Sequence, residues 1–173
     1  MKASPKDTIE IVPVEQGLIT VCVLGRTPLI LNRLSEKAKH ELLLPAGPKN
    51  RAEKQGSLKH DPIAEYQASA HRTVNPNDPT LLAAPSSAWK GAIRGAALDQ
   101  QGASKAQIGR LCFVEGEQVA IYGVPQIFMT TVRQASIQRT PDIRTRCIVP
   151  QWAAYVTISF VRPMLNDTTI VNL

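Results

Sequence analysis

Aromatic residues and cysteines are scarce in this sequence of 173 residues. Phenylalanine, tyrosine and tryptophan together make up 5% of the chain, so few side chains are available to stack on nucleic-acid bases. The three cysteines, Cys22, Cys112 and Cys147, are an odd number without the spacing of metal ligands. Because Cys22 and Cys147 lie within apolar, strand-like runs, we interpret the cysteines as small buried thiols in a reducing cytoplasm.

Long apolar segments are also missing. No run approaches the roughly 20 apolar residues that span a bilayer, and the N-terminus opens polar, without the apolar stretch of a signal peptide. We therefore expect a cytoplasmic protein with no membrane association.

The motifs of common catalytic sites are absent as well. The sequence has no phosphate-binding glycine loop, no C-x-x-C pair and no nucleophile elbow, and its acidic residues are scattered singly. His40, His60 and His71 lack the spacing of metal ligands. These absences predict no catalytic residue, no metal and no cofactor.

The composition that is present indicates a folded, basic protein. Hydrophobic residues make up 43% of the chain and charged residues 20%, which favours one globular domain over residues 1–173. The formal net charge is +6 and the isoelectric point is near 9.5, which favours a polyanionic partner.

The first third of the chain begins with strand-like residues. Runs rich in β-branched residues predict a strand over 18–24 and a shorter one within 8–14. A partly apolar extension follows at 27–31. Ser35 can cap a helix that we expect over 35–44.

A basic insertion is predicted at 45–80. Its first part, 45–60, contains proline and glycine, shows no periodicity and carries more cations than acids. It is either a solvated surface excursion or a flap that faces nucleic acid, and the cations assigned to the flap are Lys49, Arg51 and Lys54. A short helix over 61–68 and a turn at 75–79 complete the insertion.

The clearest helix begins at Ser86 or Ser87. Trp89, Ile93 and Ala97 fall on one apolar stripe of this helix, together with Ala96. A second short helix is predicted over 104–110.

Four strand-like segments follow, at 118–122, 127–132, 143–149 and 153–161. The last alternates well, because Ala154, Val156, Ile158 and Phe160 share one face. The order of elements predicts an α+β fold with helices packed on one face of an antiparallel sheet.

The first candidate site is the start of the clearest helix, with the sequence PSSAWKGAIRG at 85–95. A helix that a serine caps leaves backbone N–H groups able to bind an anion. Lys90 and Arg94 share one helix face, and Gly91 and Gly95 share another, which a neighbouring backbone can approach closely. The alternative is an ordinary capped amphipathic helix whose glycines serve packing.

The second candidate site is the arginine-rich segment 133–146. Its arginines are Arg133, Arg139, Arg144 and Arg146, and the only acid among them is Asp142. Alternation places Arg144 and Arg146 on one strand face about 6.6 Å apart, a spacing that suits successive phosphates. The alternative is a solvated edge strand that arginines protect against aggregation. We expect both candidate sites to line one groove that follows a sugar-phosphate chain.

The segment PSSAWKGAIR at 85–94 resembles the signature of the RAMP superfamily (repeat-associated mysterious proteins), and most closely the backbone subunits of CRISPR effector complexes. The segment RTRCIVP at 144–150, followed by YVTISF at 155–160, is similar to the family's arginine-bearing segment and central strand. The matched motifs cover about a fifth of the chain, and the order of elements is compatible over nearly all of it.

The resemblance implies a ferredoxin-like, RRM-like fold and a row of subunits along a guide RNA. It implies that Ser86, Ser87, Lys90 and Arg94 place the helix start and its cations against the RNA backbone. The insertion and the segment 133–146 would then clamp bound RNA and reach a neighbouring subunit.

The sequence departs from the family pattern in two ways. It ends without the glycine-rich loop that family members usually carry near the C-terminus, so we expect either a minimal domain or an incomplete C-terminus. The stretch 25–32 lacks the aspartate of the target-cleaving branch, which argues against cleavage by this subunit.

The predicted function is therefore sequence-independent binding of RNA, or of single-stranded DNA, by a protein that forms homo-oligomeric filaments in antiviral defence, with other effector-complex subunits as further partners. Two alternatives stay open. One is a virus-encoded mimic of a CRISPR subunit, or interaction module, that acts through protein partners. The other is an RNA-processing nuclease in which a histidine supplies the acid or base.

Overall fold

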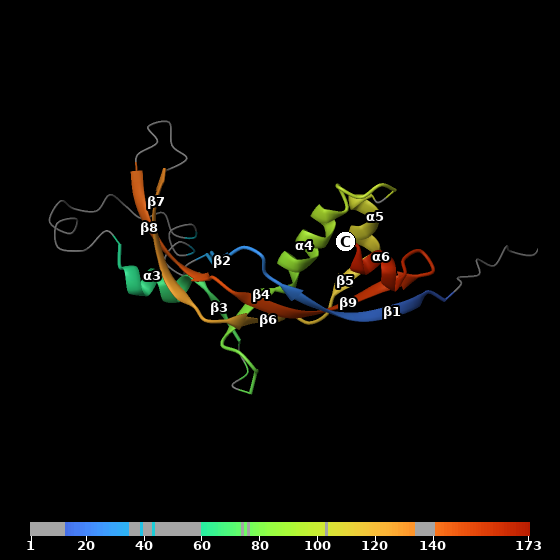
Figure 1. Cartoon of the computed structure of the whole chain (residues 1–173), viewed down its shortest axis with the longest axis horizontal. Helices are drawn as coiled ribbons and strands as arrows, with labels where there is room; N and C mark the ends of the chain where they lie inside the picture. Colours follow the sequence, from blue (N-terminus) through green and yellow to red (C-terminus); the bar gives the residue numbers. More distant parts are fainter. Residues whose placement is uncertain are drawn as a thin grey trace, which may run out of the picture.

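The computed structural model describes residues 13–34, 39, 43, 60–73, 75, 77–102, 104–133 and 141–173. They form an α+β structure of antiparallel sheets and few helices (Figure 1). The strands are β1 (Glu15–Leu24), β2 (Leu29–Leu31), β3 (His71–Arg72), β4 (Leu82–Pro85), β5 (Cys112–Val114), β6 (Gln118–Gly123), β7 (Gln126–Arg133), β8 (Pro141–Val149) and β9 (Trp152–Arg162). The helices are α3 (Pro62–Ser69), α4 (Ser86–Ala96), α5 (Lys105–Leu111) and α6 (Asp167–Val171).

The longer elements confirm the periodicity predictions to within a few residues. Strand β1 and strands β6 to β9 occupy the predicted segments, and so do α3, α4 and α5. The sequence does not predict β2 to β5, because strands of two to four residues are too short to show alternation. The segments 1–12 and 44–59, and most of 35–43, lie outside the described residues, as do Lys49, Arg51 and Lys54.

The larger sheet is built around β9. Its strand order is β1-β9-β6-β4-β3, and β5 also pairs with β9. All of these pairings are antiparallel. The predicted apolar face of β9 is confirmed, since Ala154, Val156, Ile158 and Phe160 are all buried.

The helices α4, α5 and α6 lie on one side of this sheet, over its core-facing side (Figure 1). Trp89 and Ile93 of α4 pack against the core and Ala97 is fully buried, as the predicted stripe requires. The other side of β1 and β9 stays exposed at Leu18 and Tyr155. Cys22 is exposed on that side, so the prediction that it is buried is wrong, whereas Cys112 and Cys147 are buried.

The smaller sheet has the order β2-β8-β7, and we call its β7 and β8 strands together the β7–β8 arm. Helix α3 packs against β8. Beyond the short β2, side chains of α3 accept hydrogen bonds from the backbone of β8: Glu65 Oε2 from the Thr145 N–H at 3.0 Å, and Ser69 Oγ from the Cys147 N–H at 2.8 Å. One edge of β8 is thus covered by β2 and α3, and the other by β7.

The chain passes between the two sheets at Gly123 and again at Val149. Gly123 ends β6 with a φ of +148°, a conformation that favours glycine. A Cβ atom at Gly123 would lie 2.4 Å from Cγ1 of Val149, the last residue of β8. The β6–β7 and β8–β9 connections are therefore in close contact, and the contact requires glycine.

Burial predicts where the sheet is most sensitive to mutation. Phe160 is 1% exposed, so we expect Phe160→Ala to lower the free energy of unfolding by about 3–5 kcal/mol in urea denaturation. Val124→Ala, at a side chain that is 73% exposed, is the control and should change it by less than about 0.5 kcal/mol. Equal losses in the two variants would contradict the assignment of the core.

Candidate nucleic-acid interface

Helix α4 begins directly at the end of β4, so the sheet fixes the position of the helix start. The N-cap residue is Pro85, whose side chain makes no cap hydrogen bond. The backbone N–H of Ser86 donates to the Glu117 carbonyl at 3.0 Å. The Ser86 hydroxyl is buried and has no hydrogen-bond partner. The predicted serine cap is therefore wrong, and the serine that was to provide it holds an unused buried hydroxyl instead.

The first turn of α4 is open to an anion. It contains no acidic residue, and in the described part of the chain no side chain caps the N–H groups of Ser87 and Ala88, both of which are exposed. Free N–H groups and the positive end of the helix dipole attract negative charge. The start of α4 can therefore accept a phosphate group or a carboxylate.

Packing holds the two cations of α4 toward α5 and β5. The Lys90 ammonium lies 4.0 Å from the centroid of the Phe113 ring on β5. The Arg94 guanidinium lies over Gly109 of α5, where a Cβ atom would come within 2.7 Å of its Nε. Among the described residues neither cation forms an ion pair, so both charges remain available to an anionic ligand.

Gly91 and Gly95 do not pack against a neighbouring backbone. In the part of the chain that the structure describes, nothing lies within 4 Å of a Cβ atom placed at either glycine. The prediction that these glycines serve a close contact is therefore wrong within this chain. They leave a smooth surface of small residues along α4 that begins at the exposed Ser87.

The arginines of the β7–β8 arm differ in their surroundings. Arg144 pairs with Asp142 at 3.1 Å, whereas Arg133 and Arg146 form no ion pair among the described residues. Arg144 and Arg146 share a face of β8, as alternation predicts. At these two residues β8 pairs with β7 alone, since β2 reaches only Cys147, Ile148 and Val149, and α3 covers the other side of β8 at Thr145, so the edge-strand alternative stays open. Arg139 lies outside the described residues.

The two candidate sites occur in different parts of the molecule. Helix α4 packs against β4, β5 and α5, whereas β8 packs against β2, β7 and α3. Figure 1 shows the arm extending away from α4. The structure brings the α4 residues together, and separately Arg144 and Arg146, but it does not bring the two groups into contact. The single shared groove that we expected is therefore replaced by two basic surfaces.

A polar cluster that the sequence does not predict joins α3 to the arm. His60 Nδ1 lies 2.5 Å from Glu65 Oε1, and His60 Nε2 lies 2.8 Å from Asp142 Oδ1, so both ring nitrogens are occupied. Partial burial raises the pKa of Glu65. The hydrogen bonds from the Thr145 N–H and from His60 outweigh this effect and hold the pKa below its ordinary value. The cluster orients α3 and leaves no nitrogen of His60 for a substrate. Sequence reasoning missed it because the partners lie 82 positions apart.

The two buried cysteines lack the character of reactive thiolates. Burial raises the pKa of the Cys112 thiol, although Lys90 opposes the effect, and burial alone raises that of Cys147, so neither is an activated thiolate. Among the described residues no group of His, Cys, Asp and Glu could hold a metal ion.

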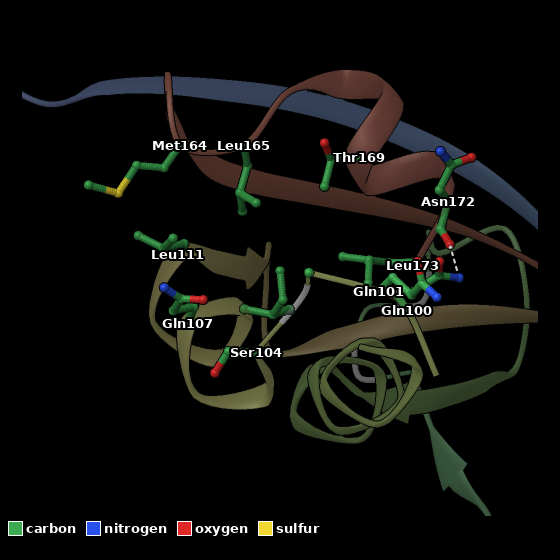
Figure 2. A pocket seen from close by; sticks show the side chains of 12 residues that line it. Gln100, Gln101, Ser104, Gln107, Leu111, Met164, Leu165, Thr169, Asn172 and Leu173 are labelled. Atoms are coloured by element: carbon green, nitrogen blue, oxygen red, sulfur yellow. Dashed lines mark hydrogen bonds between the residues drawn. The ribbon is translucent and has the colours of Figure 1, made fainter. Parts of the chain in front are cut away.

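A cavity of about 640 Å³ lies between α5, the loop that precedes it and α6. Figure 2 shows Leu111, Leu165 and Thr169 around it, with Gln100 donating to the Asn172 carbonyl at its rim. The side chains that line the cavity are neutral. The nucleophilic groups among them are hydroxyls, and no general base among the described residues lines the cavity beside them. The described lining therefore offers no cationic side chain to a phosphate group.

The lowered pKa of Glu65 predicts how the α3–arm contact responds to acid. The ionised carboxylate stabilises the fold at any pH above 4.5, its ordinary pKa, and this contribution is lost as the pH falls through the lower folded value. We expect Glu65→Gln to lower the melting temperature at pH 7 and the difference from the parent protein to shrink below pH 4.5. Glu115→Gln, at an exposed position, is the control. A difference for Glu65→Gln that is the same at pH 7 and pH 3 would contradict this role.

Comparison of the chain with protein-family models, with curated proteins and with solved structures finds no match. Within the described residues no helix is long and apolar enough to cross a membrane.

Proposed function

We propose that this protein binds RNA through the phosphate backbone, without reading its base sequence, as a repeated subunit of a helical ribonucleoprotein filament of the CRISPR effector type. The observation that carries the proposal is the start of α4. There, among the described residues, the buried Ser86 hydroxyl has no partner, the first-turn N–H groups are uncapped, and Lys90 and Arg94 lack a carboxylate partner. A phosphate bound at this helix start would contact the uncapped N–H groups and the two cations, because the Ser86 hydroxyl is buried.

The composition of this surface favours a phosphate backbone over bases. The Lys90 ammonium lies over the Phe113 ring, 4.0 Å from its centroid, so this ring is already covered. Reading bases requires exposed aromatic platforms or base-edge contacts, whereas phosphates require only N–H groups and cations. Binding that is independent of sequence is the result expected from such a surface.

The β7–β8 arm supplies the second part of the proposal. Arg146 and Arg133 project from the arm without an ion pair among the described residues, and Arg144 is held by Asp142. Because the arm extends away from α4, one RNA strand would reach both surfaces only by following the molecule over some length, or by passing to the next subunit. A filament along RNA provides that arrangement.

We also propose that the observed α+β fold is a ferredoxin-like, RRM-like arrangement. We propose that the protein is cytoplasmic. The α4 segment at 85–94 and the strand β9 are the parts that resemble the RAMP superfamily. The proposed subunit does not cleave RNA, since His60 has both nitrogens occupied and the stretch 25–32 has no acid.

Neutralising the α4 cations tests the proposal directly. We expect Lys90→Gln with Arg94→Gln to weaken binding of every single-stranded RNA alike, since glutamine keeps much of the side-chain stem and removes only the charge. The slope of log affinity against log salt should fall by about 1.4, for two phosphate contacts on a single strand. Filter binding at several salt concentrations measures both quantities.

The matched control is Arg26→Gln with Arg72→Gln, which removes the same net charge from exposed positions outside α4. An equal loss of affinity in both double variants would show that only net charge matters and would refute the assigned surface. Affinity that is unchanged in the α4 variant would do the same.

The two glycines of α4 give an independent test. Gly91→Ala with Gly95→Ala should stabilise the free protein by up to about 1 kcal/mol per site, because alanine favours the helix and meets no neighbour. If a phosphate chain approaches α4, the added methyl groups should still weaken RNA binding. Thr168→Ala on the exposed face of α6 is a control that favours a helix without touching α4. A stabilised α4 variant with full affinity would exclude close approach at this face.

A further inference from the structure

Two long strands have one side unpaired within the described part of the chain. Strand β1 is the end strand of the larger sheet and pairs only with β9, and β7 is the end strand of the smaller sheet and pairs only with β8. They are 10 and 8 residues long. Alternate backbone N–H and C=O groups on the outer side of each strand can therefore pair with a strand of another molecule. We call these outer sides the β1 edge and the β7 edge.

Neither edge carries the features that usually prevent such pairing. Proteins protect edge strands with lysine, proline, an inward-pointing charge or a very short length. The only charged residues of the two strands are Glu15, at the start of β1, and Arg133, at the end of β7. By contrast, the side of β8 that faces away from β7 is covered by β2 and by α3 side chains. The other two end strands that the structure describes, β2 and β3, have only three and two residues, so β1 and β7 are the long edges of this part of the chain.

The two edges are complementary in one antiparallel register. Antiparallel pairing places the start of one strand opposite the end of the other, so Glu15 can face Arg133. Both side chains are exposed, and neither forms an ion pair among the described residues. An opposite-charge pair across two strands stabilises their pairing, and like charges destabilise it.

The same register also joins apolar side chains. With Glu15 opposite Arg133, the residue numbers of each facing pair sum to 148, so Ile19 faces Met129 and Val21 faces Ile127. Ile127 and Met129 are 51% and 52% exposed in the single chain, whereas Ile19 and Val21 pack at the margin of the core. Pairing would extend the core side of β1 over these two exposed side chains and remove their apolar surface from water.

The contact must form between two molecules. Figure 1 shows β1 and β7 in different parts of the molecule, so they cannot pair within one chain. A contact between two different surfaces leaves one β1 edge and one β7 edge free on every assembly, and it continues into an open chain unless the rotation closes a ring. Pairing of β1 with β1 would instead place Glu15 opposite Leu24, with no charge gained, and would close a dimer.

We infer that the β1 edge of one copy pairs with the β7 edge of the next, with Glu15 opposite Arg133, and that this contact is the repeating joint of the filament. The inference rests on the proposed function for its filament, and it assigns Arg133 to the contact between copies, leaving Arg144 and Arg146 to RNA. The joint itself requires no RNA, which allows the two ideas to be tested separately.

Charge reversal tests the register. Full-length protein is freed of nucleic acid with nuclease and high salt, and its assembly at low salt is followed by sedimentation velocity over a range of concentrations. We expect concentration-dependent assembly for the parent protein. Glu15→Arg or Arg133→Glu alone should raise the half-assembly concentration by about twofold to thirtyfold, because an attractive pair becomes a repulsive one. The double variant, Glu15→Arg with Arg133→Glu, should restore assembly.

Met129→Lys gives a second test that depends on the edge itself. The side chain is half exposed, so the change is tolerated by the fold, but it places a charge opposite Ile19 and should abolish assembly. Val124→Lys, in the exposed connection before β7, is the control and should assemble normally. A parent protein that stays monomeric at every concentration, or a double charge reversal that fails to restore assembly, would overturn the inference.

Cross-linking separates an open chain from a dimer. Residues 18 and 130 face each other in the proposed register. We introduce Leu18→Cys and Thr130→Cys together into protein that carries Cys22→Ser, and treat the purified variant with a short bismaleimide. The remaining cysteines, Cys112 and Cys147, are buried. The paired variant should give a ladder extending beyond dimers, whereas each single variant should give dimers at most. A paired variant that gives no species larger than a dimer would refute the head-to-tail joint.

The results also distinguish this inference from the proposed function. Assembly without RNA, combined with no RNA affinity, would overturn the proposed function and support the joint. RNA affinity that depends on Lys90 and Arg94, with no edge pairing, would support the proposed function and overturn the joint.

Discussion

The pairing of β9 with three neighbours is the constraint on which the rest of the structure depends. This strand hydrogen-bonds to β1 along its whole length and to β5 and β6 on its other side. Its inward side chains, from Ala154 to Phe160, form the centre of the core against which the helices pack. The start of α4 is fixed because β4 joins the same sheet through β6. The candidate phosphate site therefore depends on an aliphatic sheet that has no chemical role of its own.

Periodicity in the sequence was sufficient to predict the parts that pack on this sheet. The alternation of β9 and the stripe of Trp89 and Ile93 each reflect one buried face, and burial is what selects apolar residues at regular intervals. The short strands β2 to β5 could not be predicted in this way. Their pairing is decided by neighbours distant in the sequence, such as Ile121 beside Leu82, and two to four residues carry no measurable period.

The candidate sites were predictable in composition but not in placement. The sequence predicted that Lys90 and Arg94 share a face, since a spacing of four residues in a helix requires it. It did not predict that Ser86 would be buried without capping the helix, because that outcome depends on Glu117 accepting the bond from the Ser86 N–H. It also could not separate the arm from α4, since the path of the chain between the two sheets is set by tertiary contacts. The contact of His60, next to α3, with Asp142 of β8 was unpredictable for the same reason, because the two residues are 82 positions apart.

The crossing at Gly123 and Val149 has a consequence for the geometry of any assembly. Because two connections pass side by side and touch there, the arm is attached to the larger sheet by a braced joint and not by a single flexible link. This contact restrains the angle between the two sheets. If successive copies join through the arm, that angle sets the rise and rotation from one copy to the next, and with them the pitch of the helix and the length of ligand that each turn can hold. One glycine at the crossing would thus govern a dimension many times larger than the protein.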